Sequence, residues 1–490
     1  MKKINYFKKI VIPVVSIFFL FSCTDMLDVK SISTITNASM WKSEDDVNGG
    51  VNGMYVQMRG AVSRNYHYAG ELRSEVFGPG LMGAETPYVY LYNQTLSADI
   101  PVITWQSFYS VVNAANLVIK NAPGLSFQSE SNKNKALAQA YAMRAFIYFV
   151  MTRTWGDLII HTDPIESSNP DVIYKERSSQ ADVFKLIKED LDQAIQLFPD
   201  NSYPSGRCFW SKPATNALKA DVYLWTGKRM NGGDADFTVA LQALNEIVNT
   251  DVALLPEFGD IFKYDNKGNQ EIVMVCRFQE IEAGDNIGWS MWIHPPSVPA
   301  DIDDEAREII FPVNSQGQFT PTAVYRDQYE PGDTRKNGSM YDLYSNNEYY
   351  TSVVLKFAGM ISGGTRYHLN DIIFYRYADI LLMIAEAKNA LRQDPSPEIN
   401  LVRERAYKEN YSNHIYSNST QAINDEVILK ERLLELAMEG KRWWDLIRFD
   451  KVFDLVPALQ DKRGQNQYLL FPIGTSVLSL EPNVRQNQGW

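Results

Sequence analysis

Few side chains in this sequence are spaced for catalysis. None of the five histidines has another histidine four residues away, and H-E-x-x-H, G-x-S-x-G and G-x-x-x-x-G-K-[ST] motifs are absent. The acidic run at residues 301–305 could supply the paired carboxylates of a glycoside hydrolase. An acidic run in a proline-rich loop is more commonly solvated, so we expect no enzyme. No cofactor or metal site is expected either.

Aromatic side chains in two irregular segments are stronger candidates for a binding role. The segments are residues 88–93 and 284–296, and their aromatic side chains are Tyr88, Tyr90, Tyr92, Trp289 and Trp292. Neither segment has a helical period, and both are flanked by Gly and Pro, which favour loops open to solvent. The alternating tyrosines either line one face of a short strand or line a binding groove.

The N-terminus has the pattern of a lipoprotein signal peptide. Four lysines precede the apolar run Ile10–Phe21, which is too short to span a membrane, and the segment ends Leu-Phe-Ser-Cys at Cys23. We expect cleavage before Cys23 and lipid attachment to it. The alternative is an ordinary secretory signal with an incidental cysteine. Residues 23–40 then form a polar tether.

Composition is that of a globular protein, with 45% hydrophobic and 22% charged residues. The net charge of −12, which becomes more negative once the signal peptide is removed, argues against a nucleic-acid partner. Cys208 and Cys276 remain after cleavage, and the sequence leaves open whether they pair.

Helical periodicity dominates the remainder of the chain. It predicts a first helix starting at Ser43 and three helical hairpins, with helices at residues 135–155 and 182–198, 213–228 and 237–249, and 375–391 and 396–407. Between the second and third hairpins, residues 251–370 are irregular, with short strand-like runs such as 271–278.

A further helical stretch, Ile428–Lys451, predicts a buried structural element. Its apolar residues recur at three- and four-residue steps, and the opposite face is mostly filled by Glu431, Arg432, Glu435, Glu439, Lys441 and Arg442. We expect Glu439 and Arg442 to pair along the helix. Gly440 either separates two helices or lets another backbone approach. Of Trp443 and Trp444, we expect one in the core and the other against a second element.

Several motifs resemble those of the SusD/RagB family of Bacteroidetes surface lipoproteins. They are ERLLELAMEGKRWWDLIR at 431–448, RAFIYF at 144–149, WGD at 155–157, LLFPI at 469–473 and N-x-x-Q-N-x-G-W at 483–490. The resemblance implies a mainly α fold with a tetratricopeptide-like scaffold of helical hairpins, large irregular loops and a few short strands. It also implies a single body from 41 to 490, with an N-terminal region at 41–250 and a C-terminal region at 251–490.

The resemblance further implies a function. Such proteins are lipid-anchored at the outer-membrane surface, bind oligosaccharides without catalysis or cofactors, and pass them to a SusC-like TonB-dependent transporter. The alternatives are a RagB-like peptide binder on the same fold and a surface glycosidase. Exposed tryptophan platforms would favour glycan, whereas an aliphatic or charged cleft would favour peptide.

The resemblance transfers no site residue by motif, so the site is predicted from the loops. We expect one face built from Tyr88 to Asn93 and from the 284–296 segment with Trp289 and Trp292. Contacts to sugar hydroxyls are expected from three further residues, namely Arg73, Glu75 and Arg366.

Overall fold

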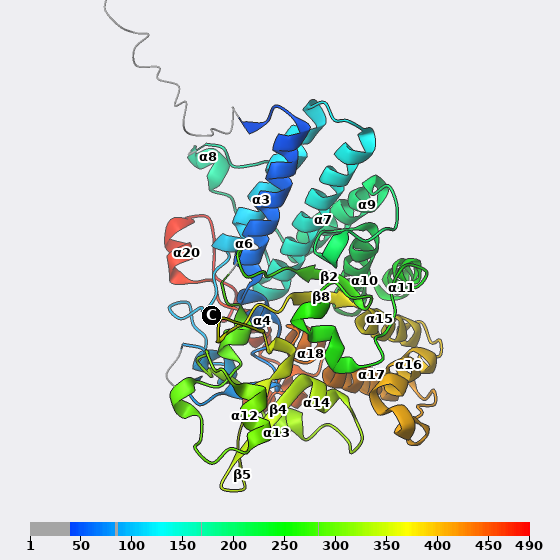
Figure 1. The fold of residues 1–490 in the computed structure, drawn as a ribbon. Coiled ribbons are helices and arrows are strands. Elements are labelled where there is room, and N and C mark those ends of the chain that lie inside the picture. The colour runs from blue at the N-terminus through cyan, green and yellow to red at the C-terminus, as the bar shows by residue number, and fades with distance from the viewer. Residues whose placement is uncertain (1–39, 84–86, 168, 283) are drawn as a thin grey trace, which may run out of the picture.

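The computed structural model describes residues 40–490 except 84–86, 168 and 283. The predicted signal peptide, Cys23 and nearly all of the predicted tether lie outside these residues. Figure 1 shows long helices packed side by side, with α3, α6, α7 and α9 at the top and α10, α11 and α15 to α17 along the right-hand side. The expected mainly α fold with few short strands is confirmed.

The predicted hairpin helices all form, with shifts of a few residues at their ends. The longer helices are α3 (Glu44–Val62), α6 (Gln106–Asn121), α7 (Glu130–Trp155), α9 (Gln180–Leu197), α10 (Lys212–Arg229), α11 (Gly233–Val248), α15 (Tyr377–Ala390), α16 (Ser396–Tyr407) and α17 (Gln421–Leu436). The Ser43 side chain accepts a hydrogen bond from Asp46 N and caps α3. α7 is followed by Gly156, whose φ of 79° favours glycine.

The strands described by the structure form four antiparallel pairs. They are β1 (Phe77–Pro79) with β3 (Phe319–Pro321), β2 (Ile272–Cys276) with β8 (Ile372–Arg376), β4 (Met340–Ser345) with β5 (Glu348–Val354), and β6 (Met360–Ser362) with β7 (Thr365–Tyr367). The strand-like run predicted at 271–278 is therefore confirmed as β2. The pair β2–β8 is buried and leads directly into α15.

The largest hydrophobic cluster draws on both the N-terminal and the C-terminal halves of the chain, from Val47 to Val484. No helix within the described residues is both long enough and apolar enough to cross a membrane. Cys208 and Cys276 are both free thiols, the first half-buried and the second buried.

The stretch Ile428–Lys451 forms two main helices rather than one. α17 ends at Leu436 and α18 (Arg442–Arg448) begins after Gly440, whose φ is 81°. Both roles considered for Gly440 are present, because a Cβ on Gly70 would collide with the Gly440 carbonyl. Glu71, buried beside this break, accepts backbone N–H groups from Met438 and Lys441, both at 2.8 Å.

Both tryptophans of this stretch are buried, each against a different cation. The Arg73 guanidinium lies 4.3 Å from the Trp443 ring centroid, and that of Arg153 lies 3.8 Å from the Trp444 ring. Trp444 also meets Tyr66 edge-on, with ring centroids 5.3 Å apart. Both indoles therefore belong to the core.

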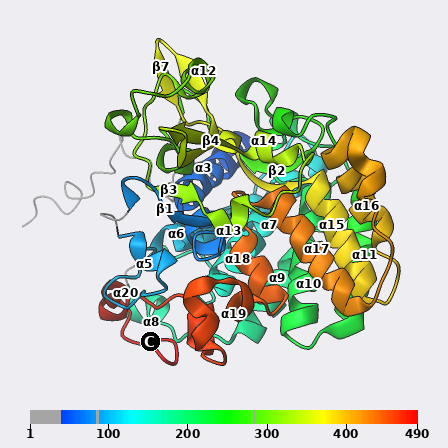
Figure 2. The same ribbon diagram turned by 90° about the horizontal axis from the view of Figure 1, so that it is seen from below.

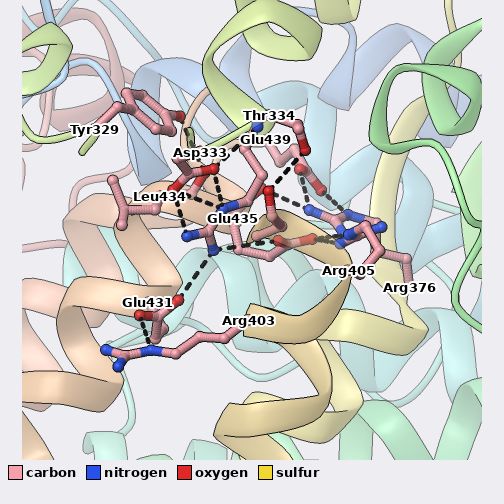
Figure 3. Close-up of polar contacts among 12 residues, drawn as sticks. Tyr329, Asp333, Thr334, Arg376, Arg403, Arg405, Glu431, Leu434, Glu435 and Glu439 are labelled. Atoms are coloured by element: carbon pink, nitrogen blue, oxygen red, sulfur yellow. Dashed lines mark hydrogen bonds and ion pairs between the residues drawn. The ribbon is translucent and has the colours of Figure 1, made fainter. Parts of the chain in front are cut away.

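The charged side chains of the same stretch are buried, and they pair with distant parts of the chain. Figure 3 shows Arg376, Arg405, Glu435 and Glu439 at the centre of this network. Arg376 at the end of β8 donates to Glu271 at 2.8 Å, Glu435 at 2.5 Å and Glu439 at 2.8 Å, and Arg405 of α16 also contacts Glu435. These charges form a polar core that joins β8, α16, α17 and Glu271, the residue before β2.

The expected pairing of Glu439 with Arg442 is wrong. Glu439 accepts from Lys356 and Arg376, whereas Arg442 donates to Glu75 at 2.6 Å. The break at Gly440 turns the two side chains toward different elements, so the helical spacing that predicted the pair does not apply.

Electrostatics within the buried network favour ionised carboxylates. Burial alone would raise the pKa of Glu435, but the guanidinium groups of Arg405, Arg376 and Arg335 lower it well below its usual range. Likewise, Lys441 and Arg432 outweigh burial and lower the pKa of Asp379 to about 2. Both carboxylates are therefore ionised at neutral pH, and it is the neighbouring cations that keep them ionised despite burial.

Candidate functional site

The structure brings the two predicted loop segments together, although about two hundred residues separate them in sequence. The connection is the stretch at the start of β3. Gln318 N donates to Ser290 O at 2.9 Å, and Gln318 O accepts from Gly80 N at 2.8 Å and from the Tyr92 hydroxyl at 3.5 Å. Figure 2 shows α5, β1 and β3 as neighbours when the molecule is seen from below.

Residues 88–93 form a helical turn rather than a strand. Tyr88 caps α5 (Val89–Tyr92), so Tyr88 and Tyr92 lie four residues apart on one side of a turn. Both rings pack edge-on against Phe319, at centroid distances of 5.3 and 6.1 Å. All three tyrosines of the segment are half-buried, and Asn93 is exposed.

Trp289 is half-buried, and two residues of the α3–α4 region link it to the tyrosines. The Arg64 guanidinium lies 5.4 Å from the Trp289 ring centroid. Tyr68, one turn later in α4 (Asn65–Gly70), lies 4.9 Å from Tyr88 between ring centroids. We call the set Arg64, Tyr88, Tyr90, Tyr92, Asn93 and Trp289 the aromatic face.

Two buried polar atoms beneath the aromatic face have no hydrogen-bond partner among residues 40–490 as described. They are Ser290 Oγ and Gln318 Oε1. The Tyr68 hydroxyl is approached by Tyr88 and Arg64, and burial together with Tyr88 raises its pKa, so it keeps its proton. Unpartnered buried polar groups are costly and uncommon, and they are often found where a ligand or water completes the bonding.

Trp292 and Arg366, both predicted in the site, are instead part of the core beneath the loop. Trp292 is 2% exposed and donates from Nε1 to Ile310 O at 3.3 Å. The Arg366 guanidinium lies 4.6 Å from its ring and donates to backbone carbonyls, among them Pro312 O at 3.0 Å. Because the Trp292 ring is covered and the Arg366 N–H groups are used by backbone carbonyls, neither side chain is available to a ligand.

Arg73 is also buried, and it fastens the C-terminal segment. Its guanidinium donates to Leu470 O at 3.1 Å and to Gln94 Oε1 at 2.9 Å. Burial lowers the pKa of Arg73 to about 9. The predicted contact between Arg73 and a sugar hydroxyl is therefore wrong, because the side chain points into the molecule and its donors are used.

Glu75 is buried against Arg442 and lies away from the aromatic face. Its second carboxylate oxygen, Oε2, has no partner in the described part of the chain, and the residue lines a separate cavity of about 280 Å³. That cavity lies between α13 (Ala323–Arg326), α17 and α19 (Val452–Leu455). Glu75 therefore does not join the predicted loops.

The acidic run considered for glycoside hydrolysis has structural contacts. Asp303 caps α12 (Asp304–Ile310) by accepting from Ala306 N at 2.7 Å. Asp301 accepts from Asn346 N at 2.6 Å and holds the β4–β5 turn. Within the residues that the structure describes, no group of His, Cys, Asp and Glu could hold a metal ion.

The chain matches two family models that together span most of its length. The model described as "SusD family" matches residues 309–490, and the model described as "starch-binding associating with outer membrane" matches residues 25–224. The chain is 32% identical to the solved structure of Bacteroides fragilis NanU, covering 94% of this chain and 100% of that one, with a TM-score of 0.82. It belongs to the SusD/RagB family.

More distant relatives agree with this assignment. SusD-like protein P38 of Formosa agariphila is 26% identical, with 99% of each chain covered. The solved structure of surface glycan-binding protein A from Bacteroides thetaiotaomicron, in complex with laminarihexaose, has the same fold. Its identity to this chain is 19%, its TM-score is 0.72, and the match covers 91% of this chain and all of that one.

Sequence reasoning missed Arg64 and Tyr68. Both lie at the end of a helical region whose periodicity indicates scaffold, and no local motif marks them. The residues that connect the loops, Gln318 and Phe319, gave no signal either, because their role depends on the pairing of β1 with β3.

Proposed function

We propose that this protein binds an oligosaccharide at the aromatic face without catalysis and delivers it to a SusC-like TonB-dependent transporter. The observation that carries the proposal is the meeting of the two aromatic loops around β3, above two buried polar atoms, Ser290 Oγ and Gln318 Oε1, that have no partner among the described residues. The relative whose structure contains laminarihexaose supports a glycan as the ligand.

The chemistry of the aromatic face suits a sugar chain. The half-buried rings of Trp289 and the α5 tyrosines can stack against the C–H surfaces of sugar rings. The exposed amide of Asn93 and the guanidinium of Arg64 can bind hydroxyl groups. Because Tyr88 and Tyr92 already pack against Phe319, little of their conformational entropy is lost on binding.

Peptide binding on the same fold is the second candidate. An exposed tryptophan platform favours glycan, whereas an aliphatic or charged cleft would favour peptide. Of the two loop tryptophans, only Trp289 offers a partly open ring, and its described ring contact is the Arg64 guanidinium. The aromatic face therefore supports glycan as the cargo.

We expect Trp289→Ala to weaken binding of a cognate oligosaccharide about thirtyfold, which corresponds to roughly 2 kcal/mol for a central aromatic residue. Isothermal titration calorimetry measures this loss, and the unfolding midpoint should stay close to that of the parent. Trp490→Ala is the matched control, because Trp490 is also half-buried but lies at the C-terminus. Parent-like binding by Trp289→Ala would place the site elsewhere.

We further propose that the protein is attached to the outer membrane through lipid on Cys23 and faces the exterior. The family description associates it with the outer membrane, and no described helix could hold it there. Cys23→Ala should therefore release the mature protein from membranes, because several acyl chains supply the anchor. Co-sedimentation of the variant with outer membranes from cells that lack the transporter would contradict this anchor.

A further inference from the structure

A cavity of about 590 Å³ lies apart from the aromatic face, between α6 and the short helix α20 (Thr475–Leu480). Its size falls within the range of small-molecule sites. α20 is fixed beside it by Thr475 N, which donates to Ala98 O at 2.8 Å. The loop after α7 and the short helix α8 (Pro170–Ile173) complete its walls.

The polar groups of this cavity come from several elements and are partly unsatisfied. Glu481 Oε2 is buried and has no hydrogen-bond partner in the described part of the chain. His161 is 7% exposed, and no hydrogen bond to its ring is present among the described residues. Asn113 accepts from Ile165 N at 2.7 Å, which leaves its Nδ2 donors for another partner.

Burial shifts the pKa of two of these groups. Burial raises the pKa of Glu481, and burial lowers the pKa of His161 to about 4, which keeps the imidazole neutral at pH 7. No Lys or Arg is among the described residues that line the cavity. An anionic ligand would therefore meet no cation here and would be repelled by an ionised Glu481.

Flat rings and aliphatic side chains form the remaining wall. Trp105 and Tyr109 of the α6 start meet edge-on with ring centroids 5.6 Å apart, and Tyr109 meets His161 at 5.9 Å. Leu480, on the rim, is 71% exposed. An aromatic wall beside hydrogen-bonding groups matches the alternating C–H and hydroxyl surfaces of a sugar.

We propose that this cavity is a second binding site, for a neutral saccharide unit of one or two rings, with Glu481, His161 and Asn113 as hydroxyl partners. The site does not depend on the aromatic face, because none of the residues that form that face lines the cavity. It would hold a chain end or a free small sugar, whereas the aromatic face offers an open surface.

Saturation-transfer NMR on the purified mature protein tests this site with methyl glycosides of glucose, galactose and mannose at about 10 mM, a concentration suited to millimolar affinity. Ser476→Trp should block the cavity and weaken binding at least tenfold. Ser479→Trp is the matched control, because it is also an exposed serine of α20 but does not line the cavity. It should bind like the parent.

Two variants of Glu481 test the chemistry. Glu481→Gln should retain binding, because the amide still forms hydrogen bonds, whereas Glu481→Leu should lose at least tenfold. Glucosamine and glucuronate serve as charged comparison sugars in the same experiment. The proposal is overturned if no neutral glycoside binds, if Ser476→Trp and Ser479→Trp bind the glycosides equally well, or if only the charged sugars bind. Loss of glycoside binding in Trp289→Ala would assign that binding to the aromatic face and overturn it as well.

Discussion

Arg376→Met is expected to destabilise the protein by about 3–5 kcal/mol, the usual effect of removing one partner from a buried ion pair. Arg376 is fully buried, and among the described residues it is the one side chain that contacts all three of Glu271, Glu435 and Glu439. Methionine preserves much of the volume but leaves three carboxylates with fewer cations. The free energy of unfolding, from denaturant titration at pH 7, measures the effect.

The pH dependence of this loss is a sharper test of its electrostatic origin. In the parent, ion pairing lowers the pKa values of Glu435 and Glu439. Their contribution to the free energy of unfolding is therefore fully present above the pKa of an unfolded glutamate and is lost as the pH falls toward their folded pKa values. Without Arg376 these groups can take up protons more readily. The difference between parent and variant should therefore narrow toward pH 4.

Arg392→Met is the matched control for the buried network. Arg392 pairs with Asp234 at 2.7 Å, but both side chains are mostly exposed, and exposed pairs contribute little. We expect its unfolding midpoint to match that of the parent. Equal midpoints for Arg376→Met and Arg392→Met would mean that the network does not stabilise the fold.

The second large effect is expected at Trp444. Trp444→Ala should cost about 3–5 kcal/mol through lost packing and the cavity left behind. Its ring contacts Tyr66 and lies under the Arg153 guanidinium, and its Nε1 has no hydrogen-bond partner within the described residues, so packing dominates. Trp444→Phe keeps a ring there and should cost less.

Ligand binding separates scaffold from site in these variants. The fraction of Trp444→Ala that remains folded should bind the cognate oligosaccharide as the parent does, because Trp444 of α18 lies in the core against Tyr66 of α4. If Trp444→Ala lost affinity while its unfolding curve stayed the same, Trp444 would belong to the binding site and not to the scaffold.

The helical scaffold could be predicted from the sequence because its apolar residues repeat with the helical period. The same reasoning did not give the partners of the charged face of 428–451, and its one predicted pair, Glu439 with Arg442, is wrong. That face meets Arg376, Arg405 and Lys356 from other elements. Burial of a balanced ionic network depends on tertiary partners, which periodicity does not reveal.

The meeting of the two loops was predicted from the sequence, and the burial of their individual side chains was not. Trp289 and Trp292 stand three residues apart in one loop, and each has an arginine near its ring, yet Trp292 also donates to Ile310 O and is buried. Local composition is the same for both. Likewise, Arg73 and Glu75 precede an aromatic loop in sequence but turn toward the C-terminal segment and α18.

The most direct test of glycan binding is a glycan array probed with the mature protein carrying Cys23→Ala, alongside a peptide library at the same protein concentration. We predict retention on one family of neutral or charged oligosaccharides, no retention on peptides, and loss of the glycan signal in Trp289→Ala but not in Trp490→Ala. Retention on peptides with no glycan signal would contradict the proposed function and favour the peptide-binding alternative.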